Sequence, residues 1–393
     1  MRIHRILAEA CVVLLQQVFE EGRVLDRVMA EAFKANPKWG KRDRGFVAES
    51  VWEVVRWRRA LEFVVGSGDL RSLLAAEWRR QGFDLPDWWE WAGESFDEMA
   101  SRELQINSQP RAIRESIPDW LDRLGSAELG LRWDTELEAL NQRAPVFLRV
   151  NRLMATKGEV LSWLADENVE VAEVGGLDDA LVLPLGKIFP KRLVQDGRVE
   201  IQDAGSQSVV PMLEVEPGMR VVDACAGAGG KTLQLASEMN GSGEILALDV
   251  VARKLVELKR RAGRAGARNI RMEEWGKDTL KSRIGWADRV LVDAPCSGLG
   301  TLRRQPDLKW RLSEEILLET RDLQERLLEN CLEFLKPEGK LVYATCSILP
   351  SENTGLLKEL VLRDSRWKIA QESVVSPAET GWDGFYAARV ERR

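Results

Sequence analysis

The sequence DACAGAGGKT, residues 223–232, follows an apolar run at 219–222 and ends in Gly-Lys-Thr. Small residues directly after a strand let the backbone approach a ligand closely as the chain turns into a helix. A P-loop would need glycine at position 225, where Cys225 stands, and Asp223 would repel a triphosphate. The loop therefore favours a different ligand from a nucleoside triphosphate.

Strands and helices alternate from about residue 211 onward. Four apolar runs separated by helical lengths predict βαβ units: MRVVDA (219–224), EILALDV (244–250), DRVLVDA (288–294) and GKLVYAT (339–345). Such units form a mainly parallel, doubly wound α/β sheet of the Rossmann type, which binds ligands at the carboxyl ends of its strands.

An acidic residue at the end of the second of these strands indicates the kind of ligand. Asp249 stands where a carboxylate would accept hydrogen bonds from ribose hydroxyls. The glycine loop and this acid together predict a site for an adenosine cofactor. Nicotinamide, flavin and S-adenosylmethionine sites all share the arrangement, so the two features alone leave these three open.

The preceding half of the chain has a different character. Residues 1–135 show helical patterns, beginning with an amphipathic stretch in which Leu7, Cys11 and Leu14 share one face. The aromatic segment at 88–91 predicts core anchors between helices rather than platforms for stacking bases. Residues 136–210 read as a small α/β subdomain with short strands at VFLRVNRL, ALVLPL and RVEIQD around a helix at KGEVLSWLADEN.

Composition excludes several classes of protein. The chain has 393 residues, 45% hydrophobic and 31% charged, which is typical of a globular protein with two or three domains. One histidine and five scattered cysteines without Cys-x-x-Cys spacing suggest neither a metal site nor a disulfide framework. No apolar run is long enough to span a membrane, so we expect a cytoplasmic protein. We also expect it to be a monomer.

Charge argues against nonspecific coating of nucleic acid, because the formal net charge is −6. Two local basic clusters stand out against it: Lys41, Arg42, Arg44, Arg56, Arg58 and Arg59 in the first, and Arg253, Lys254, Lys259, Arg260, Arg261, Arg264 and Arg268 in the second. Without further evidence, each is a solvated helix face.

Two cysteines follow the later strands of the sheet. Cys296 lies in DAPCSG and Cys346 in ATCSILP, so two thiols are expected to flank the cofactor site, whereas Cys11 and Cys331 fall on apolar helical faces and fit the core. With S-adenosylmethionine, such a pair suits methylation of a pyrimidine at carbon 5. A thiolate adding at carbon 6 makes carbon 5 nucleophilic, an acid such as Asp293 supports the base edge, and a second thiol assists release.

These motifs resemble those of the Sun/Fmu, or RsmB-like, family of RNA cytosine-C5 methyltransferases. The resemblance covers roughly residues 145–393 and is carried by VQDAGSQSVVPMLEVEPGMRVVDACAGAGGKT, LALDV, DRVLVDAPCSGLGTLRRQPDLKW, LVYATCSILPSEN and GWDGFYAARVER. It implies that Cys346 is the nucleophile and that Cys296 assists product release, an order that spacing alone leaves open.

The same resemblance implies the pocket for S-adenosylmethionine. Its residues would be Cys225, Ala226, Gly227, Ala228, Gly229, Gly230, Lys231, Asp249, Asp278 and Asp293. Where the family usually has Ala-Pro before Gly-Gly-Lys, this chain has Gly227-Ala228, which removes a fixed φ angle and leads us to expect altered cofactor affinity.

The resemblance also implies RNA as the partner. PVFLRVNRL resembles the family's small RNA-contacting subdomain and places Arg149 and Asn151 nearest RNA, while KRDRGFVAESVWEVVRWRRALEFVV resembles a NusB-like helical domain whose basic cluster would dock RNA. The expected substrate is ribosomal RNA of the small subunit, with the target cytosine unstacked. Two alternatives remain: the same chemistry on transfer RNA, and a noncatalytic RNA-binding assembly factor on a methyltransferase scaffold.

Overall fold

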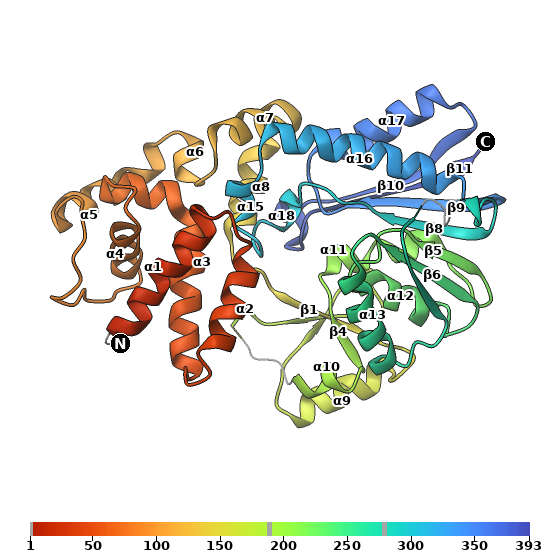
Figure 1. Cartoon of the computed structure of the whole chain (residues 1–393), viewed down its shortest axis with the longest axis horizontal. Coiled ribbons are helices and arrows are strands. Elements are labelled where there is room, and N and C mark those ends of the chain that lie inside the picture. Colours follow the sequence, from red (N-terminus) through yellow and green to blue (C-terminus); the bar gives the residue numbers. More distant parts are fainter. Residues whose placement is uncertain (1–2, 187–190, 277–280) are drawn as a thin grey trace. The chain divides into compact units, whose positions relative to one another are not determined.

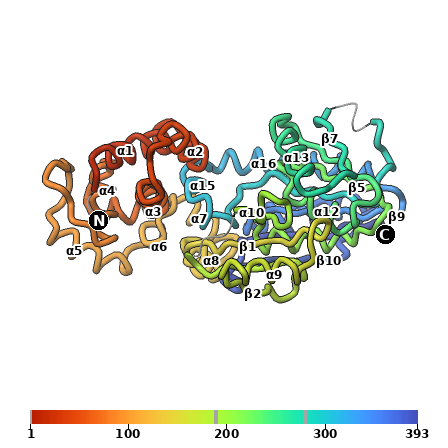
Figure 2. The backbone as a smooth tube through the Cα atoms, turned by 90° about the horizontal axis from the view of Figure 1, so that it is seen from below, coloured from red at the N-terminus to blue at the C-terminus, as the bar shows by residue number. Residues whose placement is uncertain are grey.

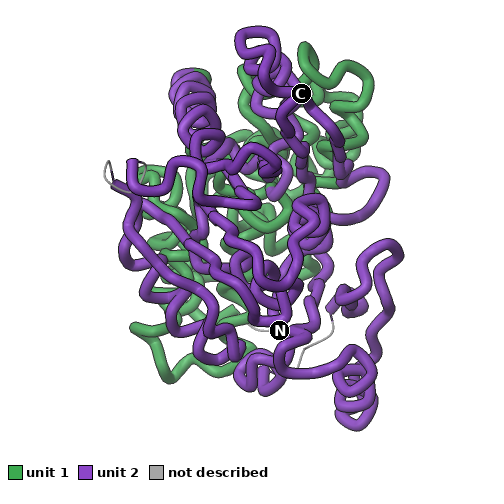
Figure 3. The backbone as a smooth tube through the Cα atoms, turned by 90° about the vertical axis from the view of Figure 1, so that its right-hand side faces the viewer, with its two compact units in different colours: residues 1–142, 302–314 green, residues 143–301, 315–393 purple. Residues whose placement is uncertain are grey.

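The computed structural model describes residues 3–186, 191–276 and 281–393. The chain divides into two compact units: Met1–Gln142 with Leu302–Glu314, and Arg143–Thr301 with Glu315–Arg393 (Figure 3).

The first unit is helical. Its elements are α1 (Arg5–Phe19), α2 (Leu25–Ala35), α3 (Lys41–Val65), α4 (Leu70–Arg80), α5 (Phe96–Gln105), η1 (Ile106–Ser108), α6 (Arg111–Arg114), α7 (Asp119–Leu129), α8 (Arg132–Asn141) and α15 (Leu308–Arg311). The amphipathic stretch at the start forms α1 and buries Leu7, Cys11 and Leu14, as predicted. Trp89 is buried in the same core, and Trp88 and Trp91 pack against it, which confirms the prediction of core anchors.

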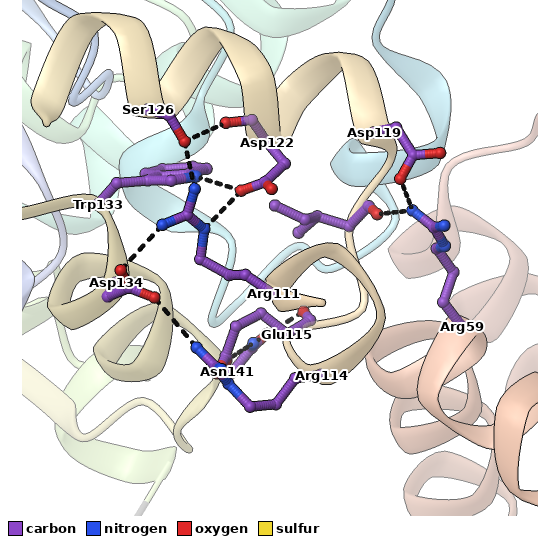
Figure 4. Close-up of polar contacts among 11 residues, drawn as sticks. Arg59, Arg111, Arg114, Glu115, Asp119, Asp122, Ser126, Trp133, Asp134 and Asn141 are labelled. Carbon is purple, nitrogen blue, oxygen red and sulfur yellow. Dashed lines mark hydrogen bonds and ion pairs between the residues drawn. The ribbon is translucent and has the colours of Figure 1, made fainter. Parts of the chain in front are cut away.

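Helices α6 to α8 are joined by a polar cluster (Figure 4). The Arg111 guanidinium donates to Asp122 at 2.6 Å and to Asp134 at 2.8 Å, and the indole N–H of Trp133 donates to Asp122 at 2.9 Å. Trp133 and Leu137 are fully buried, so α8 runs through residue 135 as one packed helix. The helical unit consequently extends to Gln142, beyond the expected boundary at 135.

A later segment of the chain, Leu302–Glu314, belongs to this helical unit. The fully buried Lys309 donates from Nζ to the Arg56 carbonyl at 3.2 Å and to Asn141 Oδ1 at 2.6 Å. The indole of Trp310 donates to the Val55 carbonyl at 2.8 Å. Local patterns within residues 1–135 gave no sign of this insertion.

The second unit begins with a small antiparallel sheet in the order β2-β3-β1-β4. Its elements are β1 (Val146–Val150), α9 (Lys157–Asp166), β2 (Ala172–Glu173), β3 (Ala180–Leu183), α10 (Lys191–Gln195) and β4 (Val199–Ile201). Helix α9 is labelled in Figure 2. It starts with a capping box, in which Thr156 and Glu159 exchange hydrogen bonds, and it packs Val160 and Leu164 against residues of the sheet. The predicted strands and helix of this segment are all present.

The large sheet has seven strands in the order β10-β11-β9-β8-β5-β6-β7. They are β5 (Arg220–Asp223), β6 (Glu244–Asp249), β7 (Ile270–Glu274), β8 (Ala287–Asp293), β9 (Leu335–Thr345), β10 (Trp367–Val375) and β11 (Phe385–Arg392). Strands β5 to β9 pair in parallel, and β11 runs antiparallel to both of its neighbours. The predicted doubly wound α/β fold is confirmed.

Helices cover both faces of this sheet (Figure 1). The helical elements of this part of the chain are α11 (Ala204–Gln207), η2 (Val210–Leu213), α12 (Gly230–Glu238), α13 (Ala252–Arg264), η3 (Leu299–Thr301), α16 (Glu314–Leu332), η4 (Pro350–Glu352), α17 (Thr354–Arg363) and α18 (Pro377–Thr380). Because side chains alternate along a strand, Val221 packs with α12 and α13, whereas its neighbour Val222 packs with α16 and α17. Across the described residues, no helix has the length and apolar character needed to cross a bilayer.

Candidate active site

The candidate site lies at the carboxyl ends of four adjacent parallel strands. Strand β5 pairs with β6 on one side and with β8 on the other, so the connections leaving it diverge there. This is the switch point at which open α/β sheets bind ligands. The strands end in Asp223, Asp249, Asp293 and Thr345, and the glycine loop and both strand-end cysteines follow directly.

The glycine loop adopts a backbone that requires glycine at two positions. Gly227 has φ 56° and Gly229 has φ 94°, both in the region that L side chains rarely adopt. A Cβ atom on Gly229 would lie 2.1 Å from Leu258 Cδ1, whereas one on Gly230 would have no neighbour within 4 Å. The loop thus packs against α13 at Gly229. The space beside Gly230 is open and is available to a cofactor.

Asp249 ties the end of β6 to this loop. One carboxylate oxygen accepts from the Gly227 amide at 2.9 Å and the other from the Val251 amide at 2.8 Å. Each oxygen keeps a further lone pair for a ribose hydroxyl. The neighbouring residues also hold the loop, because the Ala226 amide donates to the Leu248 carbonyl at 2.8 Å and the Ala228 carbonyl accepts from Arg261 at 2.8 Å.

Acidic side chains border the loop. Lys231 Nζ lies 2.7 Å from an oxygen of Asp293, and Thr232 donates to the buried Asp223 at 2.7 Å. Burial raises the pKa of Asp223 to about 7, and burial followed by the nearby acids raises the pKa of the Cys225 thiol. Several carboxylates around an open glycine turn suit a cationic sulfonium, so these residues fit S-adenosylmethionine.

The two strand-end cysteines meet at the same edge of the sheet. Cys296 Sγ lies 3.4 Å from Cys346 Sγ, and both side chains are partly exposed, whereas Cys11 and Cys331 are fully buried. The adjacent Cys346 sulfur, followed by burial, raises the pKa of Cys296 well above its usual value. Cys296 is therefore held as a thiol beside Cys346.

Sequence reasoning missed three residues behind the cysteines. Glu352 is buried and accepts hydrogen bonds from Ser297 and Ser347, the residues that directly follow Cys296 and Cys346. Glu352 is part of the segment LPSEN, but nothing in that segment predicted that its carboxylate would contact the loops that carry the two cysteines.

The two residues expected nearest RNA are buried. Arg149 is 1% exposed and donates from Nε to Gln202 at 2.7 Å, and Asn151 is 3% exposed and donates to the carbonyls of Gly197 and Ala265. Asn151 thus joins the small sheet to the end of α13, and Arg149 is held by Gln202 after β4. These contacts favour a structural role for both residues over contact with RNA. The reason is that Arg149 on β1 and Asn151 directly after it both turn toward buried partners. Asp278 lies outside the described residues.

Three of the six residues of the first basic cluster are paired with acids within the helical unit. Arg56 is buried against Glu53, and Arg59 pairs with Asp119. Arg58 pairs with Glu62 and lies over the Phe19 ring. The positive charges of these three arginines are therefore not free to bind RNA. The second cluster is split. Arg261 and Arg264 both pair with the buried Glu200, and Arg253, Lys259 and Arg268 stay exposed.

Comparisons with known proteins agree with this geometry. Residues 210–390 match the family described as 16S rRNA methyltransferase RsmB/F, and residues 117–186 match a ferredoxin-like domain described for RsmF/B-like methyltransferases. The chain is 31% identical over 302 residues to ribosomal RNA small subunit methyltransferase B of Shewanella oneidensis, covering 72% of this chain and 69% of that protein.

Solved structures are similar over long stretches. The crystal structure of PH0851 aligns over 100% of both chains with a TM-score of 0.80 at 22% identity, which shows a shared fold. A methyltransferase homolog protein from Pyrococcus horikoshii aligns over 72% of this chain and 97% of its own, with a TM-score of 0.65 and 25% identity.

The fold, the site and these matches define an S-adenosylmethionine-dependent methyltransferase. More specifically, the chain belongs to the 16S rRNA methyltransferase RsmB/F family.

Proposed function

We propose that this protein methylates carbon 5 of a cytosine in RNA, through a transient covalent bond between Cys346 and the base. The observation that carries the proposal is the 3.4 Å separation of the Cys346 and Cys296 sulfurs at the strand ends that also carry the glycine loop. A single thiol would suffice for addition. A second thiol in contact with it indicates chemistry in which the bond must also be undone.

The glycine loop, Asp249 and Asp293 would hold S-adenosylmethionine, which would supply an electrophilic methyl group. The Cys346 thiolate adds to carbon 6 of cytosine, and the electron pair this places on carbon 5 makes that carbon the nucleophile. Asp293 lies at the end of β8 with its side chain 31% exposed, where its free oxygen can hold the cytosine edge. Lys231 keeps that carboxylate in place from the other side.

Cys296 acts after methylation. The hydrogen bond with Cys346, followed by burial, raises the pKa of Cys296, so Cys296 enters the reaction as a thiol. After the Cys346 sulfur has bonded to carbon 6, Cys296 releases its proton to solvent. The Cys296 thiolate then takes the proton from carbon 5 as the S–C6 bond breaks, which restores the Cys346 thiolate.

We propose ribosomal RNA of the small subunit as the substrate, because the matched family and the Shewanella oneidensis relative are both described as acting on it. Exposed Arg253, Lys259 and Arg268 near α13 offer cations for phosphates. The affinity should then fall with rising salt.

The test is incubation with radiolabelled S-adenosylmethionine and separated small-subunit ribosomal RNA and transfer RNA, followed by mapping of 5-methylcytosine. We expect label in the ribosomal fraction, no product from Cys346→Ala, and a covalent protein–RNA adduct from Cys296→Ala. Label in transfer RNA alone would refute the substrate. Full activity of Cys346→Ala would refute the mechanism, and absence of any methylation with retained RNA binding would indicate a noncatalytic assembly factor.

A further inference from the structure

A single buried carboxylate links the loops that carry the two thiols. Glu352 is the last residue of η4 and is only 1% exposed. Its Oε1 accepts from the Ser297 amide at 2.8 Å, and its Oε2 accepts from the Ser297 hydroxyl at 2.5 Å and from the Ser347 hydroxyl at 2.5 Å. Both donors are the residues immediately after a strand-end cysteine.

Further polar contacts support this connection between the two loops. The two serine hydroxyls lie 3.1 Å apart, and Gln324 of α16 donates to Glu352 at 3.1 Å and to the Pro295 carbonyl at 2.9 Å. The next residue, Asn353, accepts from the Thr345 hydroxyl at 2.5 Å and donates to the Ser347 carbonyl at 2.9 Å. These contacts brace the residues on either side of each cysteine.

Backbone hydrogen bonds alone bring the two loops near each other but leave their side chains less determined. The Gly300 amide donates to the Cys346 carbonyl at 2.9 Å, which fixes the separation of the main chains. The orientation of each cysteine depends further on how its following serine is held. A buried carboxylate that accepts from both serines restricts the two loops together.

We propose that Glu352 is the positioning residue that sets the distance and orientation between the Cys296 and Cys346 sulfurs, and thereby the rates of the covalent steps. This inference rests on the proposed function for its catalytic consequence, although its geometric content does not. Because Glu352 lies behind the serines and touches neither the glycine loop nor an exposed surface, it should affect turnover rather than binding of either substrate.

The geometric test uses the full-length protein without RNA or cofactor. Diamide oxidises two adjacent thiols to a disulfide, taking up their two electrons and two protons to become a hydrazine. We expect the wild type to form a Cys296–Cys346 bond, identified by peptide mass spectrometry. Glu352→Ala should form it about tenfold more slowly, with Glu352→Gln in between because its amide keeps one acceptor oxygen.

The catalytic test measures kcat and KM separately. A displacement of reacting atoms by about 1 Å lowers rates on the order of a hundredfold. We therefore expect Glu352→Ala to lose kcat on that scale while KM for RNA and the affinity for S-adenosylmethionine stay within about twofold, with partial recovery of kcat in Glu352→Gln. A change confined to KM would overturn the proposal.

The matched control is Glu359→Ala, which removes an exposed carboxylate of α17 that pairs with Arg321 at 3.4 Å. It should oxidise and turn over as the wild type does. If Glu352→Ala fails to fold, Ser297→Ala and Ser347→Ala each remove one arm of the connection and should each slow disulfide formation. Wild-type oxidation rates in folded variants would refute the positioning role, even in an active enzyme, whereas slowed oxidation in a protein that never methylates would refute the proposed function alone.

Discussion

Gly229→Ala should destabilise the methyltransferase unit by a magnitude that the structure divides into two contributions. The first is conformational, because φ at this position is 94° and an L residue there loses about 1–2 kcal/mol. The second is steric, because the new Cβ would lie 2.1 Å from Cδ1 of Leu258, which is fully buried and has little room to move. Overpacking of this kind costs about 1–3 kcal/mol, which brings the total to about 2–5 kcal/mol.

A double-mutant cycle separates the two contributions. In a Leu258→Ala background the clash disappears and only the conformational contribution remains, so Gly229→Ala should cost about 1–2 kcal/mol there. The measurement is urea unfolding of all four proteins, monitored by circular dichroism, with a coupling of about 1–3 kcal/mol expected between the two positions. An equal effect of Gly229→Ala in both backgrounds would refute the steric reasoning.

Gly230→Ala provides the contrast at the next residue. Its φ is not positive and a Cβ there would meet nothing within 4 Å, so the free energy of unfolding should stay close to that of the wild type. The added methyl group points into the open space assigned to the cofactor, so binding of S-adenosylmethionine, measured by calorimetry, should weaken at least tenfold. Destabilisation by this variant, or unchanged binding, would show that the cofactor space is wrongly placed.

Two further predictions concern buried charges. Burial and the nearby Arg56 lower the pKa of Lys309 to about 7 from 10.5, so above pH 7 the unfolded chain binds a proton that the folded chain does not. The free energy of unfolding of the wild type should therefore rise by about 2 kcal/mol between pH 7 and pH 9 relative to Lys309→Met, and parallel pH profiles would contradict this. Glu200→Gln leaves two arginines of α13 without their buried partner and should lower the free energy of unfolding by about 3 kcal/mol, whereas Glu257→Gln on the exposed face of α13 should leave it unchanged within error. Similar losses in both variants would mean that the Glu200 pairs are no more than surface contacts.

The sequence predicted those parts of the molecule that depend on local pattern. Apolar runs bounded by turns gave strands β5, β6, β8 and β9, because burial on both faces leaves a continuous hydrophobic signal. Strand β7 was not predicted: IRMEE carries charges, and its side chains are only partly buried at the edge of the sheet. The glycine loop was recognisable for the same local reason, since positive φ angles need glycine.

Long-range partners could not be predicted in this way. Arg149 lies on β1 and Asn151 directly follows it, and only their contacts with Gln202 and Ala265 show that both side chains face inward. The arginines of α3 form a basic cluster in the sequence. The acids that pair with them lie on neighbouring turns of α3 or, in the case of Asp119, far along the chain. Glu352 is the clearest case, because its role depends on two serines that follow different strands.

The assignment of Leu302–Glu314 to the helical unit has a consequence for biosynthesis. Ribosomes deliver residues 1–142 long before this segment, so the N-terminal helices emerge without the lysine and tryptophan that later enter their interior. Their final packing has to wait until residues 302–314, which lie between β8 and α16, have been translated. A fragment ending at residue 142 would accordingly be a poor substitute for the native N-terminal half in any reconstitution experiment.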